Sequence, residues 1–162
     1  MNIALDFTTL YQKVSRSLSI IGKRSIDDNG NLLFKDITIG SREQEIINDF
    51  FINAFTELCA ELNKFISAEV QNQGSSITSI ALTVTTPGNW NSALELSVSQ
   101  ALFNYCVSYA LYSWFIITAP RIAEKYLADT VRQMSAIRSL IHEKKAPADP
   151  VSSPLDIETT VE

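Results

Sequence analysis

Hydrophobic positions in the first part of the chain repeat with helical spacing. From Asp6 to about Ile21, apolar residues recur at steps of four, four and three, which marks one face of a helix, and Gly22 then offers a C-cap. Ser41-Arg42-Glu43-Gln44 fits a capping box, in which the serine and glutamine side chains each bond the other's backbone. The helix that it opens should carry one broad apolar stripe: Ile47, Phe50, Phe51, Ala54, Phe55, Leu58, Leu62 and Phe65.

Strand patterns are shorter and fewer. Ile80, Leu82 and Val84 alternate with small or polar residues in the period-two pattern of a half-buried strand, which Pro87-Gly88 closes. Residues 71–76 form a polar break before it. The Asn29-Gly30 pair precedes a β-forming stretch at 32–39, so this region is predicted to be a loop or hairpin with a short strand or arm.

The pattern changes after Ser92-Ala93-Leu94-Glu95, which fits a second capping box. No charged residue occurs from Leu96 to Pro120. Serine, asparagine, glutamine and threonine residues keep the hydropathy of this run below that of a typical membrane span, so a central helix buried on most sides is predicted. Because a small domain rarely covers a whole helix, we expect neighbouring subunits to bury part of it. Pro120 should break the helix, and a last one should run from Arg121.

Together these elements predict a mainly α fold: a long-helix bundle with a small β arm or hairpin and an extended C-terminal tail. Residues 1–145 form one helical domain with short β elements, which suits a chain of 162 residues that is 46% hydrophobic. Residues 146–162 form an acidic tail with Pro147, Pro150 and Pro154, which is not expected to pack on its own.

Charge and cysteine content exclude some classes of protein. A net charge of -5 argues against nucleic acid as the main partner. Cys59 and Cys106 have neither zinc-site spacing nor a disulfide framework, so both are predicted to be buried thiols. The N-terminus lacks the features of an export signal, and we expect the protein to stay in the cytoplasm where it is made.

Candidate catalytic groups are few, and each has a simpler structural interpretation. The single histidine, His142, is expected to be a solvated residue at a helix C-terminus. Glu57 and Glu61 lack the Glu-x-x-His partners of a di-iron site and are interpreted as an exposed acidic edge. The 27–31 segment resembles the start of a calcium loop, but the position that requires glycine holds Leu32 and no glutamate completes the loop at Thr38. We therefore expect no enzyme activity, catalytic residue, metal or cofactor.

Aromatic residues at helical spacing are more typical of a core or an interface than of a cofactor site. We favour the interface for this chain, and the sequence predicts eight interface anchors: Phe51, Phe55, Tyr105, Tyr109, Tyr112, Trp114, Phe115 and Tyr126.

The order of elements, from a first helix and β arm to a Pro-Gly-closed strand, a long helix and an acidic tail, resembles head-to-tail connector (adaptor or neck) proteins of tailed bacteriophages. The resemblance is one of architecture and covers nearly the whole chain. It implies a virion structural protein, made in the host cytoplasm, that forms a homo-oligomeric ring, commonly a dodecamer, between portal and tail proteins, with DNA only passing through the channel. The β elements at 32–39 and 77–84 would meet neighbouring subunits. The docking tail would use Pro147, Pro150, Pro154, Leu155 and Ile157.

Two alternatives remain. A soluble helical scaffold or regulator would bind one protein partner through its aromatic stripe. A membrane-associated helical protein would bury residues 102–117 in lipid, although no membrane partner is expected from the hydropathy.

Overall fold

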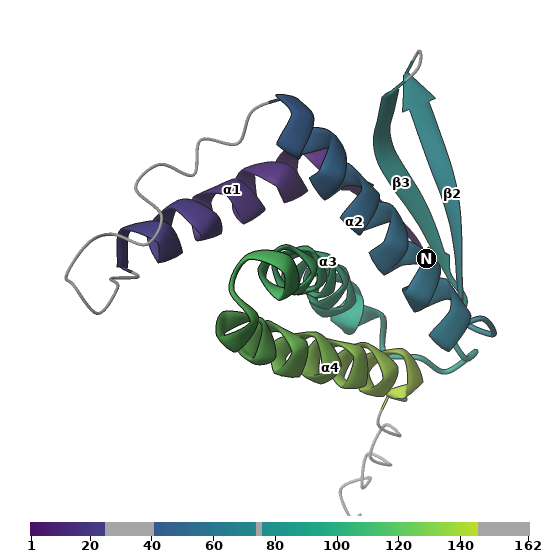
Figure 1. Ribbon diagram of the computed structural model, residues 1–162. Coiled ribbons are helices and arrows are strands. Elements are labelled where there is room, and N and C mark those ends of the chain that lie inside the picture. Colours follow the sequence, from purple (N-terminus) through teal and green to yellow (C-terminus); the bar gives the residue numbers. More distant parts are fainter. Residues whose placement is uncertain (25–40, 74–75, 146–162) are drawn as a thin grey trace, which may run out of the picture.

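The computed structural model describes residues 1–24, 41–73 and 76–145, which form four helices, a three-stranded sheet and a short 3-10 turn (Figure 1). In chain order the elements are β1 (Asn2–Asp6), α1 (Phe7–Arg24), α2 (Ser41–Glu61), β2 (Ile66–Gln73), β3 (Ser76–Val84), the 3-10 turn (Ser92–Leu94), α3 (Glu95–Thr118) and α4 (Pro120–His142). The predicted mainly helical fold with a small β part is confirmed. The predicted arm at 32–39 and the tail at 146–162 lie outside the described residues.

The sheet is antiparallel and has the strand order β1-β3-β2. Its central strand, β3, was predicted, and Ile80, Leu82 and Val84 are buried on one face as the alternation indicated. The other two strands were missed. Ile3 and Leu5 of β1 alternate with exposed residues, but five residues give a weak signal. The predicted polar break at 71–76 was wrong, because it spans the end of β2 and the start of β3.

Both edges of strand β3 are paired inside the chain, and contact of residues 77–84 with a neighbouring subunit stays a prediction. Strand β3 pairs with β1 along one edge, where Ile3 lies opposite Leu82, and with β2 along the other, where Ile66 lies opposite Val84. Both rows of backbone groups are therefore used inside the chain. Within the described part of the sheet, the free edges are those of β1 and β2.

Helices α1 and α2 pack against the sheet and against each other. Asp6 ends β1 and caps α1, because its carboxylate accepts hydrogen bonds from the backbone N–H and the hydroxyl of Thr9, both at 2.8 Å. The Phe7 ring then contacts Phe51 edge-on at 5.4 Å and stacks with Phe55 at 6.3 Å between centroids. Helix α1 runs to Arg24, so Gly22 does not end it, and α2 begins at Ser41 as predicted but ends at Glu61, before Phe65.

Helix α3 lies between α4 and the α1–α2 layer and forms the centre of the core (Figure 1). Its start differs from the prediction: the Asn91 side chain accepts from the backbone N–H of Ala93 and caps the 3-10 turn, so Ser92 is not the cap. The predicted break at Pro120 is confirmed, since α3 ends at Thr118 and Pro120 occupies the first turn of α4. Nine α3 residues are buried: Val98, Ala101, Leu102, Tyr105, Cys106, Val107, Ala110, Leu111 and Phe115.

Among the described residues, the segment Ser92–Thr118 is the one helix long and apolar enough to cross a membrane. Less than half of its most apolar window, 44%, is buried inside the chain. The chain itself therefore leaves much of the surface of this helix uncovered. Leu96, for example, is 79% exposed. That neighbouring subunits cover this surface stays a prediction.

Candidate interaction groove

The described surface has a groove of about 500 Å³ where α2, α3 and α4 meet. Each helix contributes one kind of side chain. Helix α3 supplies three tyrosines, α2 supplies two glutamates, and α4 supplies an apolar row that ends in an arginine. The lining residues are Glu57, Glu61, Tyr105, Tyr109, Tyr112, Leu127, Thr130, Val131, Met134 and Arg138.

The tyrosines form the floor of the groove because their spacing of four and three residues places them on one face of α3. Tyr105 and Tyr109 lie 6.1 Å apart between ring centroids, and Tyr109 and Tyr112 lie 6.4 Å apart. Tyr105 is 1% exposed, and its hydroxyl has no hydrogen-bond partner among the described residues. Such a buried, unpaired hydroxyl lowers the stability of the fold.

Carboxylates form the α2 wall. Glu57 and Glu61 are both exposed and stand one helical turn apart. Glu61 pairs with Arg138 of α4, whereas Glu57 lies near the tyrosines. Burial raises the pKa of Tyr109 and the pKa of Tyr105, and the negative charge of Glu57 raises both further. Both phenols thus stay protonated and can donate as well as accept hydrogen bonds.

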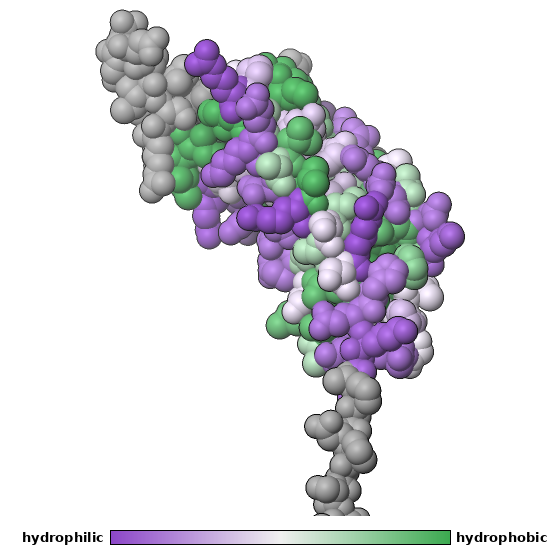
Figure 2. Space-filling view, turned by 90° about the horizontal axis from the view of Figure 1, so that it is seen from below, coloured by the Kyte–Doolittle hydropathy of each residue, from purple (hydrophilic) through white to green (hydrophobic). Residues whose placement is uncertain are grey.

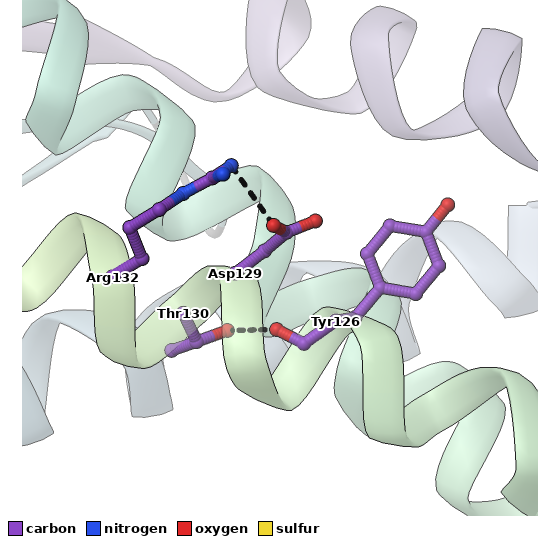
Figure 3. Close-up of polar contacts among 4 residues, drawn as sticks. All are labelled: Tyr126, Asp129, Thr130 and Arg132. Carbon is purple, nitrogen blue, oxygen red and sulfur yellow. Dashed lines mark hydrogen bonds and ion pairs between the residues drawn. The ribbon is translucent and has the colours of Figure 1, made fainter.

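The α4 wall is apolar and open to solvent. Leu127 is 44% exposed and Val131 is 62% exposed, although both project from a helix that packs along α3. Thr130 lies between them and is buried, and its hydroxyl donates a 2.7 Å hydrogen bond to the backbone carbonyl of Tyr126 (Figure 3). Arg132 pairs with Asp129 at 2.9 Å on the same helix (Figure 3). The Thr130 hydroxyl and the two charged groups are thus satisfied within α4.

The structure places the eight predicted anchors in two different environments. Phe51, Phe55, Tyr105 and Phe115 are buried in the core of the chain itself, so their rings are not available to a partner. Tyr109, Tyr112, Trp114 and Tyr126 are only partly buried and retain exposed surface. Tyr126 stacks on Phe115 at 5.6 Å, which fixes the ring of Tyr126 against the core.

Other candidate residues lie outside the groove. His142 is exposed, as predicted; its Nδ1 lies 2.6 Å from the backbone carbonyl of Arg138, and its ring contacts Phe65 edge-on.

Cys106 is fully buried as predicted, but Cys59 is only half-buried, so the prediction for Cys59 was wrong. Across the described residues, no group of three or more histidine, cysteine, aspartate or glutamate side chains could hold a metal. The 27–31 segment and the docking residues from Pro147 to Ile157 are not among those described.

The sequence indicated the tyrosines and the two glutamates as separate groups, and it did not predict that they line one groove. Their spacings within α2 and α3 were visible, and Leu127, Val131, Met134 and Arg138 also follow one face of α4. Nothing local indicates that these three faces meet. The groove depends on the crossing of helices that are far apart in sequence.

The face seen from below in Figure 2, on the α4 side of the molecule, has hydrophobic and hydrophilic side chains interspersed. It does not carry the uninterrupted apolar belt that a lipid-facing surface requires.

Comparisons with protein-family models, with curated proteins and with solved structures found no match for this chain.

Proposed function

We propose that the chain is a non-enzymatic structural subunit that associates with copies of itself through the groove between α2, α3 and α4. The observation that carries this proposal is the exposure of Leu127 and Val131 beside half-exposed tyrosines. Aromatic and aliphatic side chains in a hollow surrounded by charged groups are the usual make-up of a protein interface. A second copy would cover the part of α3 and α4 that the chain itself leaves open.

The form of assembly that we propose is a ring of the tailed-phage neck type, in a virion, between portal and tail proteins. The order of helices, with a β hairpin before the long α3 and α4 pair, supports it. The described chain ends at Lys145, whose backbone N–H bonds the carbonyl of Asn89 at 2.9 Å. The tail would therefore start from a fixed point beside the loop that leads into α3, which suits a docking extension.

A double substitution in the groove tests the proposal. Leu127→Lys with Val131→Lys removes the apolar surface of the open wall and places two ammonium groups beside Glu57 and Glu61, so it should abolish self-association while leaving the fold intact. Sedimentation velocity measures association, and circular dichroism checks the fold. Leu96→Lys is the matched control, since Leu96 is an exposed apolar residue of α3 outside the groove. Equal association of the double variant and the native chain would contradict the proposal.

A further inference from the structure

Helix α1 is basic, whereas α2, which supplies the carboxylates of the groove, is acidic. It contains four basic residues and no acidic one, whereas α2 contains five acidic residues and one basic residue. Lys13 and Arg16 are exposed on α1 and stand three residues apart, so they share one face. Within the described part of the chain neither forms an ion pair, and α1 does not line the groove.

The groove is suited to a cationic side chain. Of its three charged groups, Arg138 is paired with Glu61, and among the described residues no cation pairs with the Glu57 carboxylate, which lies beside Tyr109. Tyrosine rings attract a guanidinium or ammonium group over their faces. The Glu57 carboxylate and the exposed part of the Tyr109 ring thus favour the same cation.

We infer that the basic face of α1, with Lys13 and Arg16, docks into the groove of a second copy and places a basic side chain between Glu57 and Tyr109. This inference rests on the proposed self-association and names the two surfaces that it uses. Because these surfaces differ, the contact is heterologous: each copy offers its groove to one neighbour and its α1 to another. Repetition of this contact forms a closed ring when the rotation between neighbouring copies allows closure. The same contact cannot form a symmetric dimer.

Two charge-reversed chains test the inference, one with Glu57→Lys and one with Lys13→Glu and Arg16→Glu. Each alone opposes like charges at every contact, so its association should weaken by roughly tenfold or more. In an equimolar mixture, every contact between unlike chains again joins opposite charges. The mixture should therefore recover assemblies that neither chain forms alone. All substituted residues are exposed, and thermal melting of each chain checks that it folds.

The outcomes separate this inference from the proposed function. If the native chain associates and both charge-reversed chains associate equally well, or if mixing restores nothing, the α1 contact is wrong and self-association stands. If the native chain stays monomeric, both are wrong.

Discussion

The indole nitrogen of Trp90 donates a hydrogen bond to the backbone carbonyl of Leu140, 2.8 Å away. This bond joins the loop before α3 to the last turn of α4, and two backbone bonds lie beside it: Asn91 N–H to the Glu143 carbonyl and Lys145 N–H to the Asn89 carbonyl. The C-terminal end of the described chain is thereby held against the entry to α3.

Substitution of Trp90 by phenylalanine should loosen this join. It leaves the carbonyl of Leu140 without its indole donor, and we expect the free energy of unfolding to fall by about 1 to 2 kcal/mol. Trp114→Phe is the control, because Trp114 is also half-buried but its indole forms no hydrogen bond within the described residues. Urea unfolding followed by circular dichroism measures both. A larger loss for Trp114→Phe would contradict the role given to the hydrogen bond.

The Asp6 cap should make the stability of α1 depend on pH. Hydrogen bonding to the Thr9 hydroxyl, which outweighs a small burial effect, lowers the pKa of Asp6 below its ordinary value of 3.8. A lowered folded-state pKa contributes stability that is present above 3.8 and is lost as the pH falls through the folded value. Asp6→Ala should thus cost about 1 kcal/mol at pH 7 and progressively less at acid pH. Thermal melts of both proteins from pH 7 to pH 2 measure this, and a difference that does not shrink would refute it.

Burial of Phe51 in the chain's own core predicts a stability effect instead of an interface effect. Phe51 is fully buried against Phe7, so Phe51→Ala should lower the free energy of unfolding by about 3 to 5 kcal/mol. Ile20→Ala, at a residue that is 48% exposed on α1, should change it by less than about 1 kcal/mol. Chemical denaturation of the two variants decides the matter, and a stable Phe51→Ala protein with impaired association would restore the original interface prediction.

The two thiols should differ in reactivity. Burial raises the pKa of both, but Cys106 is fully buried and Cys59 is half-buried. Because the thiolate is the reactive form, a disulfide reagent should modify Cys59 slowly and Cys106 only after unfolding. Mass spectrometry of peptides after timed labelling measures the two rates. Equal labelling of both in the native protein would be incompatible with this packing.

Much of the fold follows from local pattern. Leu10, Val14 and Leu18 predicted the buried face of α1, and the alternation at Ile80 and Leu82 predicted β3, because helices and half-buried strands repeat with fixed periods. Strands β1 and β2 were missed because their stability comes from pairing with β3, more than seventy residues away from β1 along the chain. Polar strands such as β2 have little local signal of their own.

The groove, too, could be predicted only in part from the local sequence. The helical spacing of Tyr105 and Tyr109 was visible in the sequence, but the burial of one and the exposure of the other were not. That difference arises because α2 and α4 cover α3 unequally. The ion pair between Glu61 and Arg138 likewise joins residues that sequence reasoning had no means to bring together.

Self-association of the native chain is the central claim, and light scattering of the purified full-length protein in detergent-free buffer tests it most directly. We predict a single discrete species whose mass is a large multiple of 18.0 kDa and whose size falls as salt concentration rises. A mass of 18.0 kDa at every concentration tested would contradict the account.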